Sequence, residues 1–258
     1  MDIRFMGTGA ADFSPLLETA YKDTLDQNAR RSSSILIDGA VLIDCGPHVL
    51  DSFRIQGLDM SRVTTLLITH FHDDHFVREA AEALAAQCRE PLEIRYCADA
   101  DLAPIEHANL HPVKPGEVFT AGTYQIRPLA ANHTAFPLHY DIEDADGTRL
   151  FYGCDGAWVL YDTFYAMQNR RYDCMILDAT VGDYAGDYRL GEHNSIPMLR
   201  LMAESFKTTA VIADGGVICL SHIARTLHDP HEILEKKAEK DGFVAAYDGL
   251  TVQITRKG

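Results

Sequence analysis

Short apolar runs bounded by glycine, proline, aspartate and asparagine recur along the whole chain. Runs of this length predict buried β-strands. The predicted strands cover residues 3–6, 34–38, 41–45, 63–68, 92–97, 124–131, 138–143, 148–152, 175–177, 209–213, 217–220, 243–247 and 250–255. The last two are expected to form a hairpin across Asp248-Gly249, which is a favoured turn sequence.

Longer segments that are rich in helix formers alternate with these runs and predict helices. The predicted helices cover residues 47–56, 76–88, 100–110, 197–206 and 229–240. Two polar segments, 12–31 and 181–192, are predicted to be loops, and the first is expected to form one wall of a cleft. Because no repeat or linker interrupts this α/β pattern, residues 1–258 are predicted to form a single domain.

Composition and charge narrow the range of partners. The chain has 258 residues, and 47% of them are apolar, which is enough for a sizeable core. Its 38 acidic and 23 basic side chains give a formal net charge of -15. Because nucleic-acid binding requires a positive footprint, this charge favours a small substrate over an extended nucleic acid.

Cysteines and terminal residues bear on the compartment. The six cysteines show no Cys-x-x-Cys spacing and are predicted to be reduced, mostly buried thiols. The first residues lack the basic and apolar regions of a signal peptide, and no apolar run has the length of a transmembrane helix. We therefore expect a cytoplasmic protein that does not interact with a membrane.

The densest chemistry lies in residues 69–75, directly after the apolar run 63–68. Because side chains alternate along a strand, His70 and His72 project to one side, and the following turn can bring Asp74 and His75 into the same space. Imidazole and carboxylate ligands together predict a divalent cation. A solvated polar turn is the alternative, but crowding three imidazoles without a cation would be electrostatically unfavourable.

The motif His70-x-His72-x-Asp74-His75 resembles the signature of the metallo-β-lactamase superfamily. This resemblance implies an αβ/βα four-layer sandwich of two mixed β-sheets with outer helices, and a metal site in a cleft at the sheet edge. It also implies that three further ligands follow later strands. In this chain they are His133, Asp155 and His222.

Carried over by position, the resemblance implies two divalent cations, zinc or manganese. One cation would be held by His70, His72 and His133. The other would be held by Asp74, His75 and His222, and Asp155 would bridge the pair. Because two such cations can lower the pKa of a shared water, the expected nucleophile is a metal-bound hydroxide. Asp74 is expected to be a catalytic residue as well as a metal ligand.

Two further positions indicate a branch of the superfamily. Cys154 precedes Asp155, and since adjacent strand residues face opposite sides, only one of the two can reach the metals. Asp155 is the better candidate, because a carboxylate can bridge two cations. His193, with Asp178-Ala179-Thr180 before it, resembles the histidine that protonates the leaving alkoxide in the ribonuclease Z and phosphoribosyl cyclic phosphodiesterase families. A histidine titrates near neutrality and suits this task, although an exposed loop histidine is the alternative.

Three other residues are candidate substrate contacts. Residues 28–34 resemble an Asn/Arg/Ser pattern of the phosphodiesterase branch, so Arg30 or Arg31 could meet a phosphate; a solvated basic pair is the alternative. His48 could line the cleft or simply begin a helix.

Asp44 has a different expected role: it resembles an aspartate that supports the metal-binding loop from behind.

The resemblance as a whole implies a dinuclear-metal phosphodiesterase of small, cyclic phosphodiesters, with His193 as the leaving-group acid. A ribonuclease Z-like endonuclease and a thioester, lactone or β-lactam hydrolase are alternative enzymes. A non-enzymatic metal-binding module is an alternative of another class, which the complete ligand set argues against. Relatives in the superfamily are often dimers, so a homodimer is one expected form of the protein.

Overall fold

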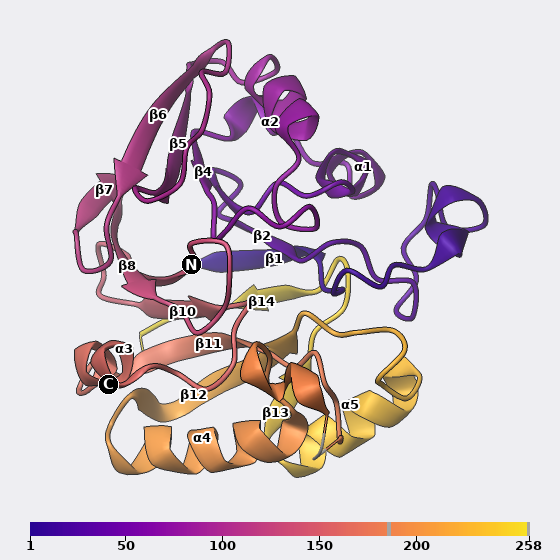
Figure 1. Ribbon diagram of the computed structural model, residues 1–258, viewed down its shortest axis with the longest axis vertical. Helices are drawn as coiled ribbons and strands as arrows, with labels where there is room; N and C mark the ends of the chain where they lie inside the picture. Colours follow the sequence, from indigo (N-terminus) through magenta and orange to yellow (C-terminus); the bar gives the residue numbers. More distant parts are fainter. Residues whose placement is uncertain (185–186, 257–258) are drawn as a thin grey trace.

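Two seven-stranded β-sheets face each other in the computed structural model, which describes residues 1–184 and 187–256 (Figure 1). In the first sheet the order is β14 (Thr251–Gln253), β1 (Asp2–Gly7), β2 (Ser34–Ile37), β3 (Val41–Ile43), β4 (Thr65–Leu67), β5 (Leu92–Cys97) and β6 (Ala108–Val113). In the second sheet it is β13 (Phe243–Ala245), β12 (Ile212–Ser221), β11 (Tyr172–Asp178), β10 (Arg149–Gly153), β9 (Leu138–Glu143), β8 (Tyr124–Ala130) and β7 (Phe119–Ala121).

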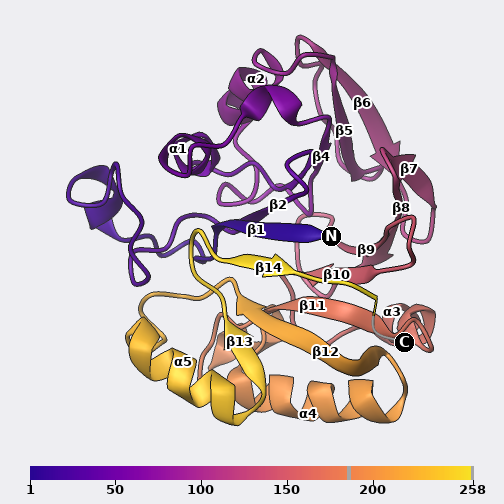
Figure 2. The same ribbon diagram turned by 180° about the vertical axis from the view of Figure 1, so that it is seen from behind.

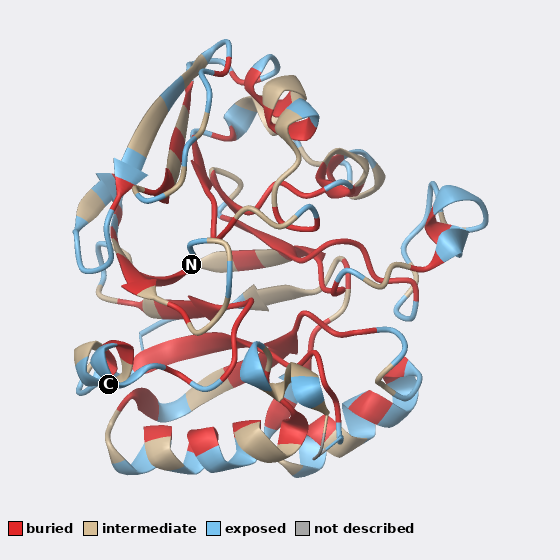
Figure 3. Ribbon diagram, viewed as in Figure 1, coloured by how far each residue is buried: buried red, intermediate tan, exposed pale blue. Residues whose placement is uncertain are grey.

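Helices cover the outer face of each sheet (Figure 2). The first sheet carries α1 (Val49–Ile55) and α2 (Arg78–Ala85), and the second carries α3 (Tyr161–Met167), α4 (Ile196–Thr208) and α5 (His231–Lys240). The outward stripes of α4 and α5 are exposed, whereas the stripes against the sheet are buried (Figure 3). The predicted αβ/βα four-layer sandwich is therefore confirmed. Among the helices of the described residues, none combines the length and the apolar character needed to cross a membrane.

The strands of the first sheet are apolar on both faces because both faces are buried. In β2, Ile35 and Ile37 pack between the sheets, whereas Leu36 faces the helices. In β4, Leu67 packs between the sheets and Leu66 faces the helices. Burying each such side chain stabilises the fold by about 1.5–3 kcal/mol, so the alternation fixes the register of β4 and the direction in which the chain leaves it.

One edge of the sandwich collects the carboxyl ends of the parallel strands. In the first sheet β3, β4, β5 and β6 are parallel, and in the second β10, β11, β12 and β13 are parallel. Residues that follow such strands gather at the same edge, where ligands commonly bind. The hydroxyl of Tyr140 donates a hydrogen bond of 2.7 Å to the backbone oxygen of Ile68 and ties the sheets together beside the metal-binding motif.

The helix predicted at residues 100–110 is wrong. This stretch leads into β6, which pairs in parallel with β5 and places Ala108 opposite Leu92. His107 has a φ of 57°, in the left-handed region that a helix cannot include. Pro112 is tolerated because β6 lies at the edge of its sheet.

The hairpin predicted for the last two strands is also wrong. β13 pairs with β12 in the second sheet, whereas β14 pairs with β1 in the first, so the chain crosses between the sheets. At the crossing, the buried carboxylate of Asp248 accepts hydrogen bonds from the Thr8 hydroxyl at 2.9 Å and the Arg31 backbone N–H at 2.8 Å. The Asp248-Gly249 turn itself forms, closed by a hydrogen bond of 3.0 Å from the Leu250 N–H to the Tyr247 backbone oxygen, but it connects the two sheets instead of closing a hairpin.

Smaller differences concern element boundaries. The strands predicted at 209–213 and 217–220 form the single strand β12, which contains Gly215 with a φ of 73°. The pattern did not indicate β7 or α3, both of which are short. Residues 185 and 186 of the predicted 181–192 loop lie outside the described residues.

Candidate metal centre

Asp44 holds the loop after β4 in place from behind. Its carboxylate accepts hydrogen bonds from the backbone N–H of Thr69 at 2.8 Å and from the hydroxyl of Thr69 at 2.9 Å. The same carboxylate lies 2.7 Å from Nδ1 of His75. These contacts lock residues 69–75 against the sheet, so the supporting position predicted for Asp44 is confirmed.

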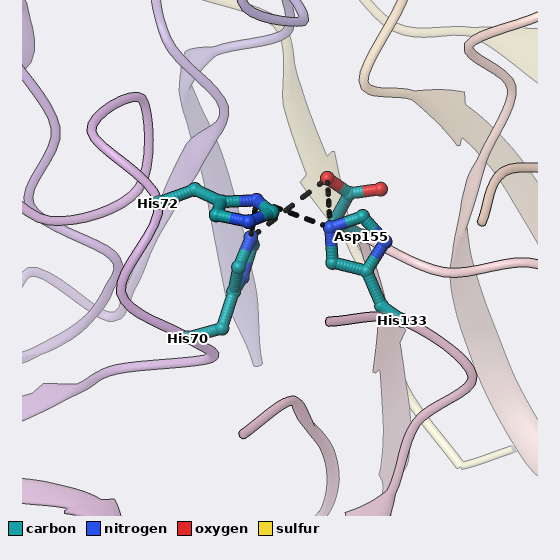
Figure 4. A group of neighbouring side chains, drawn as sticks. All are labelled: His70, His72, His133 and Asp155. Atoms are coloured by element: carbon teal, nitrogen blue, oxygen red, sulfur yellow. Dashed lines mark hydrogen bonds and ion pairs between the residues drawn. The ribbon is translucent and has the colours of Figure 1, made fainter. Parts of the chain in front are cut away.

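Three histidines and one aspartate form the first group of candidate ligands, and their side chains point toward one another (Figure 4). Nε2 of His70 lies 3.0 Å from Nδ1 of His72, and Nε2 of His133 lies 3.2 Å from the same atom. Oδ2 of Asp155 is 3.4 Å from Nε2 of His133. Residues that follow β4, β8 and β10 therefore meet at one point.

A second group consists of Asp74, His75 and His222. Nε2 of His75 lies 3.1 Å from Nε2 of His222, and Oδ2 of Asp74 is 3.4 Å from Nε2 of His222. Oδ2 of Asp155 is also 3.3 Å from Nε2 of His222, so this one carboxylate oxygen lies between the two groups. The structure thus brings together all seven side chains that the sequence singles out as metal ligands.

The spacing of these atoms fits divalent cations. Ligand atoms at about 2.0–2.1 Å from a tetrahedral cation are separated from one another by about 3.3–3.4 Å. The closest nitrogen and oxygen pairs in the two groups lie at 3.0–3.5 Å, close to this separation, and the pair of His70 Nε2 and Asp155 Oδ2 is wider, at 3.9 Å. Each group could therefore hold one cation, with Asp155 in contact with both.

The outer ring nitrogen of each of the five histidines has a partner, as is usual when the inner nitrogen binds a metal. These contacts fix the direction in which each ring points. Three of the partners are threonine hydroxyls: Thr69 lies 3.0 Å from His70, Thr134 lies 3.2 Å from His72, and Thr180 lies 2.7 Å from His222. The carboxylate of Asp44 lies 2.7 Å from His75, and the backbone oxygen of Glu192 lies 3.1 Å from His133.

The charge of the carboxylates also suits cations. Burial alone would raise the pKa of Asp155, but the neighbouring rings of His222 and His193 outweigh burial and bring this pKa well below its usual range. Burial likewise opposes ionisation of Asp74, and His75 and His222 outweigh it, so the pKa of Asp74 is lowered. Both carboxylates are therefore ionised and ready to bind cations near neutral pH.

His193 lies against the same groups. Its Nδ1 is 2.6 Å from Oδ1 of Asp155 and 3.0 Å from Oδ2 of Asp178, a buried carboxylate at the end of β11. Burial lowers the pKa of His193, but these two carboxylates outweigh it and raise that pKa to about 11. Since Nδ1 is engaged, Nε2 is the nitrogen left to meet a substrate atom.

Thr180 and Asp178, which the sequence places together with His193, contribute contacts that the sequence did not indicate. The hydroxyl of Thr180 lies 2.7 Å from Nδ1 of His222 and 3.3 Å from Nδ1 of His193, and so connects the two rings. Asp178 accepts hydrogen bonds from the backbone N–H groups of Thr180 at 2.9 Å and Asn194 at 3.1 Å. The Asp178-Ala179-Thr180 string was the available signal, but it did not reveal which side chain each residue contacts.

A cavity of about 210 Å³ opens over the two groups. Among the described residues that line it, Arg189 is the only arginine or lysine, and His193 lies beside it. The guanidinium group of Arg189 is held by Asp187, with Nε to Oδ1 and Nη2 to Oδ2 distances of 2.8 Å. Arg189 carries no recognisable sequence signal, because it is a single arginine in an irregular loop.

The three predicted substrate contacts require correction, because none is among the described residues that line this cavity. Arg30 is buried and donates from Nη1 to the hydroxyl of Thr8 at 2.8 Å. Arg31 is also buried and donates from Nη2 to the backbone oxygen of Tyr21 at 2.7 Å. His48 stands directly before α1, and its Nδ1 accepts a hydrogen bond of 3.3 Å from the backbone N–H of Ser32. Tertiary hydrogen bonds occupy all three side chains.

Two buried side chains under the site, Cys154 and His139, are not among the candidate ligands. Cys154 is fully buried, and Asp155 rather than Cys154 faces the histidines, as the alternation of strand residues predicts. Nε2 of His139 lies 3.2 Å from the backbone oxygen of Asp155, and burial lowers the pKa of His139 to about 4. His139 is therefore a neutral ring that supports the backbone at Asp155.

Comparison with known proteins gives consistent results. A family model described as Beta-lactamase superfamily domain matches residues 40–212. Among curated proteins, the chain is similar to the ribonuclease Z of Methanothermobacter thermautotrophicus, with 26% identity over 172 residues. That match covers 58% of this chain and 50% of the relative, so the chain spans about half the length of the curated relative that it matches.

Solved structures share the fold at low sequence identity. The metallo-β-lactamase fold protein YhfI from Bacillus subtilis matches with a TM-score of 0.73 and 17% identity, over 97% of this chain and 98% of that one. A diphosphatase from the PhnP family matches with a TM-score of 0.71 and 17% identity, over 98% of each chain. With the family model matched over residues 40–212, the chain belongs to the β-lactamase superfamily and has the metallo-β-lactamase fold.

Proposed function

We propose that the protein is a metal-dependent hydrolase that cleaves small, cyclic phosphodiesters. The observation that carries this proposal is the position of His193, which lies against Asp155 while Asp178 holds its Nδ1 at 3.0 Å. Cleavage of a phosphodiester releases an alkoxide, which leaves poorly unless it is protonated. An oriented, protonated imidazole at the edge of the ligand groups supplies this proton.

The donor set fits two divalent cations, zinc or manganese, although it does not distinguish them. When bound, such a pair would activate water and neutralise charge on the phosphate. The protein contributes position and charge. Asp155 and Asp74 present ionised carboxylates, and the loop after β4 is fixed by Asp44, so the ligands need little rearrangement before they bind.

Arg189 is the proposed contact for a phosphate oxygen. Asp187 holds Nε and Nη2 of its guanidinium group, which leaves Nη1 free of that ion pair and able to donate into the cavity. The backbone oxygen of Arg189 accepts a hydrogen bond of 2.8 Å from the backbone N–H of His193, so the two side chains belong to one turn. A fixed arginine favours an anionic phosphodiester over a neutral ester or lactam.

Ribonuclease Z-like cleavage is the second candidate, because the curated relative is a ribonuclease Z. The net charge of -15 opposes it, since a protein that grips a precursor tRNA neutralises several phosphates with lysine and arginine. Cleavage of a thioester, lactone or β-lactam is less favoured, because these reactions give His193 no comparable role. A binding module without catalysis would leave His193 and its partners unexplained.

The test is a substrate panel with protein loaded with zinc or manganese. It would contain bis(p-nitrophenyl) phosphate, nucleoside 2′,3′-cyclic phosphates, a precursor tRNA, a thioester and a β-lactam. We expect turnover of the cyclic phosphates with weak dependence on salt. Turnover of the precursor tRNA alone, with a steep dependence on salt, would favour the endonuclease, and no phosphodiester turnover with either metal would overturn the proposal.

A further inference from the structure

A second, larger hollow lies beside the cavity over the ligand groups. Its volume is about 940 Å³, and it shares Ala11, His72 and Asp74 with that cavity, so the two adjoin. One wall includes Phe13, at the start of the polar 12–31 segment, which projects from the body of the molecule (Figure 1). Phe71 from the metal-binding loop and Phe76 directly after that loop also line the hollow. We call this hollow the aromatic groove.

The two volumes indicate how a substrate must be placed. The cavity over the ligand groups has about 210 Å³, whereas sites for molecules the size of a nucleoside have roughly 300–1,000 Å³. A cyclic phosphate fits the small cavity, but the group attached to its sugar must extend beyond it. The aromatic groove is the adjoining space, and it is reached across His72 and Asp74.

The groove has the surface that a flat, uncharged ring requires. The rings of Phe71 and Phe76 are 5.2 Å apart with an interplanar angle of 72°, and Phe71 is also 6.1 Å from Tyr96. Phe13 packs edge-on against His48, with ring centroids 4.6 Å apart. Because these contacts hold the half-buried rings in place, a base can stack on them at little cost in side-chain entropy.

The charges along the groove exclude a second phosphate. Asp73 and Glu79 are exposed at its edge and repel anions. Arg78 also lines it, but Nε of Arg78 is paired with Glu82 at 2.8 Å, and Nη1 donates to the backbone oxygen of Ala103 at 3.0 Å. The two carboxylates can instead accept hydrogen bonds from the exocyclic amino groups of adenine, guanine or cytosine.

We infer that the aromatic groove binds the nucleobase of a nucleoside phosphodiester, while the cyclic phosphate occupies the cavity over the ligand groups. This inference rests on the proposed phosphodiesterase function and makes its substrate class specific. The enzyme then selects nucleoside cyclic phosphates over sugar cyclic phosphates that lack a base or carry a further phosphate. Phe13 and Phe76 are the residues that determine this specificity.

The test compares two substrates with the metal-loaded, full-length protein: adenosine 2′,3′-cyclic phosphate and the cyclic phosphate of methyl riboside, which has no base. We expect the base to raise kcat/KM about tenfold or more, through a lower KM, since stacking a base on an aromatic side chain has about this effect. Phe13→Ala should lower the ratio of the two kcat/KM values about tenfold. Phe76→Leu, which keeps most of the packing, should lower it in the same direction.

The control is Tyr165→Ala, which removes an exposed ring on α3 outside the groove and should leave the ratio unchanged. Calorimetry with adenosine 3′-monophosphate and ribose 3-phosphate should show the same preference without turnover. Equal kcat/KM values for the two substrates, or a ratio that Phe13→Ala does not change, would overturn the inference and leave the proposed function intact. Absence of turnover of both substrates would overturn the inference, and if bis(p-nitrophenyl) phosphate is not cleaved either, the proposed function would be overturned as well. A dimer that Phe13→Ala dissociates would assign the groove to a second copy of the chain.

Discussion

Replacement of His193 by alanine tests its role as the acid that protonates the leaving group. Asp178 keeps backbone donors when the ring is removed, among them the N–H of Gly156 at 3.2 Å and that of Thr180 at 2.9 Å, so we expect the variant to fold. A positioned general acid contributes about 10²–10⁴-fold to the rate. We therefore expect kcat on a cyclic phosphate with an alkoxide leaving group to fall about 10³-fold.

The assay compares this substrate with bis(p-nitrophenyl) phosphate. The p-nitrophenolate anion is stable near neutral pH and needs no proton to leave, so His193→Ala should change its hydrolysis by less than about tenfold. The metal content must be measured in parallel, because His193 also lies within reach of the second ligand group. Equal losses on both substrates, or loss of one metal ion per chain, would refute the role of His193 as an acid and indicate a ligand.

Three further substitutions test other parts of the account. Asp44→Ala removes the partner of Nδ1 of His75 and should weaken metal binding about 10–100-fold, measured by competition with a chelator; unchanged affinity would contradict the supporting role. Arg189→Gln should raise KM for phosphodiesters but not for a neutral p-nitrophenyl ester, and an equal effect on both would contradict a phosphate contact. His231 has its pKa lowered to about 4 by burial and by Arg30, so the unfolded chain takes up the proton first as the pH falls. When the pH falls from about 7 to about 5, the free energy of unfolding of the wild type, measured by urea titration, should therefore decrease by about 2 kcal/mol more than that of His231→Gln. Identical decreases in the two proteins would contradict this.

The metal-binding loop was predictable because its chemistry is local. His70, His72, Asp74 and His75 lie within six consecutive positions after a strand, and strand geometry alone brings them together. His133, Asp155 and His222 carry no local signal that separates them from other polar residues at strand ends. They entered through the resemblance to a family, and they meet at one edge because β8, β10 and β12, which precede them, run in the same direction.

The parts that sequence reasoning missed depend on tertiary contacts. Arg30 and Arg31 resemble a solvated or phosphate-binding pair, yet both are buried: Arg30 donates to the distant backbone oxygen of Ala246, and Nη1 of Arg31 lies 3.9 Å from Oδ2 of Asp248. The Asp248-Gly249 turn forms, but the two flanking strands belong to different sheets, so the turn does not close a hairpin. The phenylalanines of the aromatic groove have the same sequence pattern as core residues, and only the fold shows that Phe13 and Phe76 line one hollow. A cytoplasmic location and a homodimer stay predictions.

The most direct test of the central claim is the number of metal ions per chain, measured by mass spectrometry after loading with zinc or manganese and removal of free metal. Our account predicts two ions in the wild type, one ion in His222→Ala, and two ions in the control His111→Ala, whose ring is outside both groups. A wild-type protein that retains fewer than two ions, or a His222→Ala variant that retains both, would contradict it.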